Sequence, residues 1–408
     1  MLVDFGDTAW VLTSAALVML MTPALGFFYG GLVQRKNALS TIMHSFFILA
    51  LISVQWVLWG FSLSFAPGGP FIGGLSYLGF LGVGQEPNPD YSATIPFMLF
   101  AAFQMMFAII TPALITGAFA ERKRFKAMVV FTLLWATLVY APVCHMVWAV
   151  GGWLRDFGAL DFAGGTVVHI TAGVAALVAA SMLGKRIGFG QGGMEPHNVT
   201  YTVLGAGLLW FGWFGFNAGS ALGANGLAAN ALVVTNTAAA MGGLAWMTVA
   251  WIRHGHPSVV GLACGAVAGL VAITPAAGFV NVPSSLIIGL GAGVFCFFAV
   301  DIMKGNVGVD DALDVFAVHG VGGIWGALAT GLFASTAVNP LGFDGLFYGN
   351  PAQLGKQAVA VAVVAIFTAV VTAIILKVID VTIGLRVPEQ EEVLGLDTTT
   401  HGEVAYQL

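Results

Sequence analysis

Two histidines lie inside long apolar stretches, and each follows an aspartate by eight residues. The first pair is Asp161 and His169 in DFAGGTVVHI, and the second is Asp311 and His319 in DALDVFAVH. Ionisable side chains are costly at membrane depth, and those that occur there usually have a function. The repeated spacing therefore indicates one chemical device that is used in two related halves of the chain.

Paired histidines would suit the binding of a small polar molecule. Burial favours the neutral imidazole, which has one N–H donor and one bare nitrogen, so two rings can bond to each other and still offer atoms to a ligand. The alternative is that His169 and His319 are unrelated core residues, each bonded to a backbone carbonyl. Straight helices would leave the two rings roughly 10 Å apart in depth, which permits a contact without requiring one. We expect no metal site, because two histidines are too few ligands and no cysteine or carboxylate is spaced to complete a set.

The aspartates have a structural and a functional interpretation. Asp161 precedes its helix and fits an N-cap, whose side chain accepts hydrogen bonds from free backbone N–H groups. An anion near an outer cation site would also be useful, so both roles stay open for Asp161. Asp311 and Asp314 have the same capping interpretation at the second histidine.

The composition predicts an all-α polytopic membrane protein. The chain has 408 residues, of which 58% are hydrophobic and 8% are charged, whereas a soluble domain has about 25% charged residues. Apolar runs of about 20 residues, rather than alternating segments of about 10, favour membrane helices over a β-barrel. The net charge of −5 argues against a nucleic-acid partner.

Apolar windows predict eleven transmembrane helices in one domain at 1–385, followed by a polar and acidic tail at 386–408 that we expect to be flexible. The spans lie near 8–33, 40–66, 94–120, 126–147, 162–184, 199–219, 228–252, 257–274, 282–303, 313–334 and 353–385.

Basic residues predict the orientation of these spans. Twelve of the fourteen lysines and arginines fall on alternate loops and at the end of the last span, and only Arg155 and Lys356 fall on the other side. Because basic loops stay in the cytoplasm, the N-terminus should be outside and the C-terminus in the cytoplasm.

An inverted repeat relates the two halves of the predicted domain. The two Asp–His pairs open spans that enter from opposite faces, five spans apart. Ile-Thr-Pro-Ala occurs at 110–113 and again at 273–276, with the same offset of five spans. The halves cover about 8–186 and 198–334, and the eleventh helix at 353–385 lies outside them. Transporters with inverted repeats bind substrate near the midplane, between the repeats.

Five strings make the chain resemble ammonium transporters of the Amt/Mep/Rh family, nearest the Amt branch. This resemblance implies eleven helices with a pseudo-two-fold axis, a homotrimer with one pore in each subunit, and a transporter rather than an enzyme, without cofactor. The strings are GFFYGGLVQRKN at 26–37, AERKRF at 120–125, DFAGGTVVHI at 161–170, GWFGFNAGS at 212–220 and VDDALDVFAVHG at 309–320.

The resemblance also assigns residues to an outer site. It implies that Trp148, Phe107 and Ser220 recruit ammonium, and that the rings of Phe107 and Phe216 close the pore below. Taken alone, these residues have simpler interpretations. Single phenylalanines usually pack the core, and tryptophans near the end of a span usually form the interfacial belt.

Further residues and a partner follow from the resemblance. It implies that His169 and His319 line the pore, and that Asp161 takes part in recognising or deprotonating ammonium. The tail resembles the C-terminal segment of the family, whose cytoplasmic tail and loops bind PII-type signalling proteins.

These roles predict ammonium uptake across the cytoplasmic membrane, with methylammonium as an analogue. Aromatic faces stabilise a cation by roughly 0.5–2 kcal/mol each, far less than the idealised 20 kcal/mol or so for moving a bare ion into a dry interior. We therefore expect NH4+ to lose its proton near the phenyl rings and NH3 to cross, with or without a relayed proton. The alternatives are an Rh-like neutral channel for NH3 or CO2, an intramembrane metalloenzyme, and an ammonium sensor. For a sensor, the 22 residues after Arg386 are fewer than a fused signalling domain needs.

Overall fold

Residues 2–407 are described by a computed structural model, in which helices account for nearly all regular structure. A small antiparallel hairpin is formed by β1 (Pro87–Asn88) and β2 (Ser92–Pro96). The α-helices are α1 (Phe5–Leu32), α2 (Ala38–Gln55), α3 (Phe61–Phe65), α4 (Phe97–Ile115), α5 (Phe125–Trp135), α6 (Ala141–Trp148), α7 (Trp153–Phe157), α8 (Thr171–Leu183), α9 (Val199–Ala218), α10 (Gly226–His254), α11 (Val259–Ile273), α12 (Val282–Asp301), α13 (Gly322–Phe333), α14 (Pro351–Thr382) and α15 (Glu389–Leu394).

Short π-helical turns complete several of the long helical segments. Two of them, η2 (Trp56–Gly60) and η5 (Ala136–Tyr140), join α2 to α3 and α5 to α6. Two others, η6 (Gly165–Ile170) and η9 (Phe316–Val321), lead into α8 and α13 and carry His169 and His319.

Ten of the resulting segments in residues 2–407 are long and apolar enough to cross a membrane, judged by length and composition. The shorter apolar helix α11 has 15 residues and coincides with the predicted span at 257–274. Together these eleven segments correspond one to one with the predicted spans. The prediction of an all-α polytopic membrane protein is therefore confirmed.

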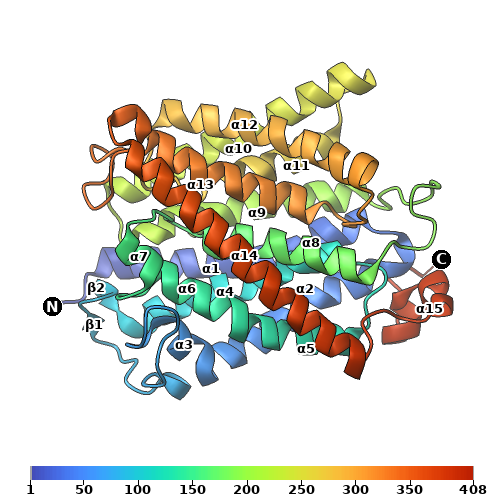
Figure 1. Ribbon diagram of the computed structural model, residues 1–408, viewed down its shortest axis with the longest axis horizontal. Coiled ribbons are helices and arrows are strands. Elements are labelled where there is room, and N and C mark those ends of the chain that lie inside the picture. The colour runs from blue at the N-terminus through green and yellow to red at the C-terminus, as the bar shows by residue number, and fades with distance from the viewer. Residues whose placement is uncertain (1, 408) are drawn as a thin grey trace.

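The long helices run between two ends of the bundle, and α14 crosses it diagonally (Figure 1). The N-terminus, the β1–β2 hairpin and α7 lie at one end, which we call the N-terminal end (Figure 1). The C-terminus and α15 lie at the opposite end, which we call the tail end (Figure 1).

The two histidine-bearing segments approach each other closely. They begin at Gly165 and Phe316, three residues later than the predicted spans at 162–184 and 313–334. A Cβ atom added at Gly173 of α8 would lie 2.1 Å from the backbone nitrogen of Gly320 in η9. One added at Gly323 of α13 would lie 3.1 Å from the carbonyl oxygen of Gly165 in η6. In each half, a glycine of the helix therefore lies against the histidine-bearing turn of the other half. Such a close approach of two backbones is possible where the residue is small.

The C-terminal tail is docked, so the prediction of a flexible end was wrong. Its Asp397 carboxylate accepts hydrogen bonds from the backbone N–H groups of Leu39 at 3.1 Å and Ser40 at 2.8 Å. These groups lie in the first turn of α2, where no side chain of the preceding residue caps the helix. The backbone N–H of Leu396 also donates to the side-chain oxygen of Asn37 at 2.8 Å. The free N–H groups of a helix start therefore hold a tail whose polar composition alone predicts disorder.

A second anchor lies earlier in the tail. Glu392 forms an ion pair with Arg386 at 2.9 Å and accepts a hydrogen bond from the backbone N–H of Ile187 at 2.8 Å. The Lys36 ammonium donates to the carbonyl oxygens of Glu392 and Val393. The tail is thus fastened to loops that lie far apart in the sequence.

We expect Asp397→Ala to release the tail. The substitution removes a cap from α2, which typically costs about 0.5–2 kcal/mol. Hydrogen–deuterium exchange should then become faster over residues 389–401. Asp380→Ala, at an exposed position of α14, is the matched control and should leave exchange in the tail unchanged. Equal protection of the tail in Asp397→Ala and in the unmodified protein would contradict this role.

Candidate functional site

Three cavities lie in series between the two ends of the bundle. The tryptophan chamber, of about 280 Å³, is lined by Trp148 and Phe107. The histidine void, of about 10 Å³, is lined by Phe216, His169 and His319. The tail-end chamber, of about 230 Å³, is also lined by His319. A void of that size has room for about one water molecule. At the histidines the cavities therefore have space for only one small molecule.

The tryptophan chamber brings together the residues predicted for the outer site. The rings of Trp148 and Phe107 are perpendicular, with centroids 5.9 Å apart. The Trp148 indole N–H donates to the carbonyl oxygen of Asp161 at 2.9 Å. The Ser220 hydroxyl donates to the carbonyl oxygen of Phe216 at 2.8 Å, which leaves its lone pairs to accept. Aromatic faces beside an oxygen acceptor are suited to a small cation.

Two phenyl rings separate this chamber from the histidine void. The centroids of Phe107 and Phe216 are 4.3 Å apart, and their planes meet at 37°. Both residues are only 1% exposed. A molecule that moves between the two cavities must displace these rings.

Asp161 caps the turn that carries His169. Both carboxylate oxygens are occupied by donors of the following residues, at 2.6–3.2 Å for the backbone groups. The donors are the backbone N–H groups of Gly164, Gly165, Thr166 and Val167 and the hydroxyl of Thr166. This geometry matches the capping interpretation and leaves the carboxylate little capacity for another ligand.

The two histidines form a direct contact. Their Nδ1 atoms are 3.2 Å apart, and the rings are nearly parallel, at 17°. One neutral ring must donate through Nδ1 and the other accept, so their two Nε2 atoms differ, one a bare acceptor and one an N–H donor. Within residues 2–407, the buried Nε2 of His169 has no hydrogen-bond partner. The separation of roughly 10 Å expected from straight spans does not occur, because the two histidine-bearing turns pack directly against each other.

Trp213 and Thr274 belong to this site, although the sequence interpretation assigned them no role. The indole of Trp213 stacks on His169, with centroids 5.4 Å apart and planes at 18°. Its N–H donates to the hydroxyl of Thr274 at 2.9 Å. A signal was available for both, because Trp213 lies in the string GWFGFNAGS and Thr274 in the second Ile-Thr-Pro-Ala.

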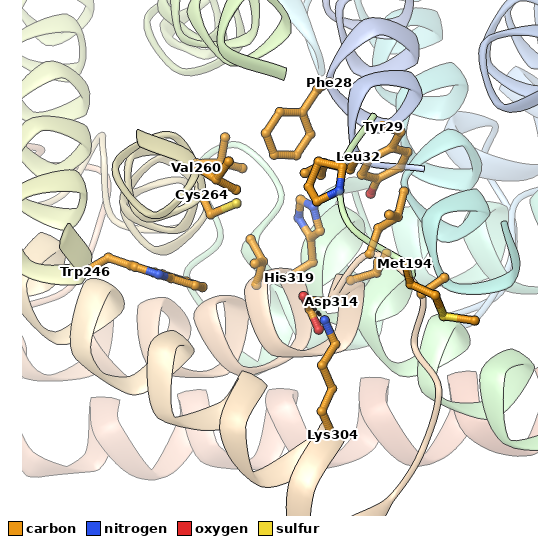
Figure 2. Close-up of a pocket in the computed structure, with 16 residues that line it drawn as sticks. Phe28, Tyr29, Leu32, Met194, Trp246, Val260, Cys264, Lys304, Asp314 and His319 are labelled. Atoms are coloured by element: carbon orange, nitrogen blue, oxygen red, sulfur yellow. Dashed lines mark hydrogen bonds and ion pairs between the residues drawn. The ribbon is translucent and has the colours of Figure 1, made fainter. Parts of the chain in front are cut away.

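The tail-end chamber holds an ion pair at its wall. Figure 2 shows the His319 ring between Phe28 and the pair formed by Lys304 and Asp314, which are 2.7 Å apart. Asp311 accepts a hydrogen bond from the backbone N–H of Phe316 at 2.6 Å. Of the two aspartates expected to cap this segment, Asp311 does so, whereas Asp314 pairs with a lysine.

The sequence matches the model of the Ammonium Transporter Family over residues 9–406. It is 55% identical over 406 residues to an ammonium transporter of Bacillus subtilis, with 99% of each chain covered. This chain belongs to the Ammonium Transporter Family. It is also 49% identical over 402 residues to ammonium transporter Amt1 of Archaeoglobus fulgidus, covering 98% of this chain and 99% of that one.

Solved structures of related proteins have the same fold. The crystal structure of Saccharomyces cerevisiae Mep2 is 39% identical and matches with a TM-score of 0.89, covering 95% of this chain and 88% of that chain. A structure described as a sensor Amt protein is 30% identical with a TM-score of 0.88, covering 97% of this chain and 98% of that chain. The predicted family and its multi-pass membrane character are therefore confirmed for this ammonium-transporter homologue.

The buried carboxyl group of Asp311 should make the stability of this family member depend on pH. Burial, with a smaller contribution from the Asp314 carboxylate, raises the pKa of Asp311 from 3.8 to about 6. The folded protein disfavours the ionised carboxylate, so the stability that Asp311 contributes is present below pH ~4 and lost as the pH rises through about 6. Asp311→Asn keeps an oxygen acceptor and removes the titration.

Thermal unfolding in detergent tests this prediction. Relative to Asp311→Asn, the unmodified protein should lose about 2–3 kcal/mol of stability between about pH 4 and pH 7. A stability difference that does not change with pH, or one that grows in favour of the unmodified protein, would show that Asp311 is not held in this way.

Proposed function

We propose that this protein takes up ammonium, binding NH4+ in the tryptophan chamber and passing NH3 through the histidine void. The observation that carries the proposal is the His169–His319 contact inside a void of about 10 Å³ between two larger chambers. A constriction of this size, walled by aromatic and aliphatic side chains and two imidazoles, suits a small neutral base.

Capture uses the rings and the hydroxyl of the tryptophan chamber. The faces of Trp148 and Phe107 attract the cation, at roughly 0.5–2 kcal/mol each. Ser220 offers an acceptor, because its own proton is engaged by the Phe216 carbonyl. These interactions concentrate NH4+ at the chamber floor, and they are too weak to carry the intact ion into the void.

The proton is lost at or near Phe107 and Phe216. Moving a desolvated ion into the dry interior costs several kcal/mol even after relaxation, whereas NH3 carries no net charge and can bond to imidazole nitrogens. A potassium ion has no proton to give up and meets the whole barrier. The released proton goes either to water in the tryptophan chamber or along the His169–His319 hydrogen bond, and only the second route makes transport electrogenic.

Asp161 supports these steps through the backbone. Its carboxylate holds the first residues of η6, which positions His169. Its negative charge also lies at the wall of the chamber that receives the cation. We assign it these two roles and not that of the proton acceptor, because both oxygens already accept hydrogen bonds.

The proposal includes an orientation and an assembly. Lysines and arginines are concentrated in the loops at the tail end, which supports an orientation with that end in the cytoplasm and the tryptophan chamber open to the outer side of the cytoplasmic membrane. The three cavities lie within one chain, in keeping with a homotrimer that has one pore in each subunit. The docked tail and neighbouring loops form the surface on which a PII-type signalling protein would bind.

Two alternatives lie within the same family. A neutral channel for NH3 or CO2 would pass no current when ammonium is added to proteoliposomes, whereas a proton relay through the histidines would. An ammonium sensor would bind ammonium in the tryptophan chamber without sustained uptake into cells.

Methylammonium uptake in cells that lack other ammonium transporters tests the proposed function. We expect His169→Ala to reduce uptake by about tenfold or more, because the substitution leaves the buried His319 ring without its partner. His256→Ala changes an exposed histidine and should take up methylammonium as the unmodified protein does. Full uptake by His169→Ala, at equal amounts in the membrane, would contradict the pore assignment.

A further inference from the structure

A third buried histidine, His145, lies outside the steps described above. It belongs to α6, which leads to α7 at the N-terminal end of the bundle (Figure 1). The residue is 1% exposed, and it lines none of the three cavities. Both ring nitrogens contact backbone carbonyl oxygens, Nδ1 that of Ser64 at 3.0 Å and Nε2 that of Gly69 at 2.8 Å. The ring therefore bridges two points of another segment.

Two carbonyl contacts require two donors on this ring. A backbone carbonyl oxygen can only accept, and a neutral imidazole has one N–H and one bare nitrogen. A neutral ring would therefore hold one nitrogen lone pair against an oxygen lone pair. The imidazolium donates through both nitrogens and satisfies both contacts. The pore pair differs, because the Nδ1 atoms of His169 and His319 face each other and need only one proton between them.

The end of a helix supplies partial negative charge beside His145. Ser64 lies in the last turn of α3, which ends the continuous helical segment Arg35–Phe65. The last four carbonyl groups of a helix have no partner within it, and they form the negative end of the helix dipole. A histidine cation that donates to one of these carbonyls is stabilised there. Burial of this charge is thus offset by the position of the ring.

Few other titratable groups face α6. The elements that pack most closely on it are α3, α7, η5 and η6, and α3 has no titratable side chain. The titratable side chains of the other three elements and of the rest of α6 are Arg155, Asp156, Tyr140, His169 and Cys144. Arg155 and Asp156 are exposed and opposite in charge, and phenols and thiols ordinarily ionise above neutral pH. His145 is therefore free to change its charge between about pH 5 and pH 8.

The bond to Gly69 fastens the loop at 66–74. This loop folds back on itself, since the backbone N–H of Gly69 donates to the carbonyl oxygen of Ile72 at 3.2 Å. It also reaches α7, because the carbonyl oxygen of Pro70 accepts from the backbone N–H of Trp153 at 2.9 Å. His145 thus ties α6 to a loop that is tied in turn to the next helix.

The bond to Ser64 bears on the tryptophan chamber. The next residue, Phe65, lines that chamber together with Tyr91 and Trp148. The hydroxyl of Tyr91 donates to the carbonyl oxygen of Phe65 at 3.0 Å, and Trp148 is one helical turn after His145 on α6. The ring of His145 therefore holds two parts of the chamber wall, Phe65 and Trp148, at a fixed distance from each other.

We propose that His145 is an imidazolium that positions the wall of the tryptophan chamber, and that loss of its second proton at higher external pH weakens ammonium capture. The proposal rests on the proposed function. A neutral ring keeps only one of its two carbonyl bonds, so either Ser64 or Gly69 is released and Phe65 is held less firmly. His145 contacts no ligand in this account and acts as a positioning residue.

Nuclear magnetic resonance measures the protonation of His145 without transport. In protein labelled with 15N at its histidines, the ring signals that disappear in His145→Gln belong to His145. We expect both of its nitrogens to carry a proton at about pH 5 and one of them to lose it by about pH 8.

Methylammonium uptake into proteoliposomes tests the effect on capture, with the internal pH held constant. Methylammonium stays protonated between about pH 5 and pH 8, so its concentration does not change with external pH. Over this range KM of the unmodified protein should rise about threefold or more, as expected for the loss of one hydrogen bond. KM of His145→Gln should stay near the high value at every pH. His256→Gln, at an exposed position, is the control and should follow the unmodified protein.

Three results would overturn the proposal. They are a His145 ring with a single proton at about pH 5, a KM of the unmodified protein that does not change with external pH, and a KM of His145→Gln that rises with pH as in the unmodified protein. If His145→Gln does not reach the membrane, His145→Asn replaces it in both experiments. Failure of the proposed function looks different, because the unmodified protein would then take up no methylammonium while the ring signals of His145 remained.

Discussion

The structure depends on the hydrogen bond between two buried imidazoles, because each ring supplies the partner that the other requires. His169 and His319 are 1% and 3% exposed, and their Nδ1 atoms meet at 3.2 Å in a void with room for about one water. A neutral ring in such a place must find a partner for at least one nitrogen, and each ring provides it for the other. The rest of the void is walled by apolar side chains such as Val168 and Phe216.

Both halves of the chain use the same means to bring the rings together. An aspartate holds the start of each segment, Asp161 through five hydrogen bonds and Asp311 through the N–H of Phe316. A glycine of each helix lies against the histidine turn of the other half. The antiparallel segments therefore meet at their N-terminal turns, at the same depth. This arrangement explains how an inverted repeat builds one central site from two distant parts of the sequence.

Much of this organisation could be predicted, and the exceptions have physical causes. The apolar runs predicted the eleven helical segments, and the Asp–His spacing identified the two central residues. The contact itself could not be predicted, because it depends on the close packing of Gly173 against Gly320 and of Gly323 against Gly165, which are far apart in the sequence. Docking of the tail was missed because Asp397 binds backbone N–H groups of α2, which carry no sequence signal. Trp213 lies in the string GWFGFNAGS, and it was missed because its contact with His169 joins residues that lie far apart in the sequence.

The central claim is that the histidine void passes a small base and excludes ions that have no proton to lose. Potassium and ammonium have similar charge and size, so the comparison of their permeation through purified protein in liposomes is the most direct test. We expect ammonium gradients to drive transport, detected as current or as a pH change inside the vesicles, while potassium gradients of equal size drive none. Potassium flux at a rate comparable to that of ammonium would contradict the claim.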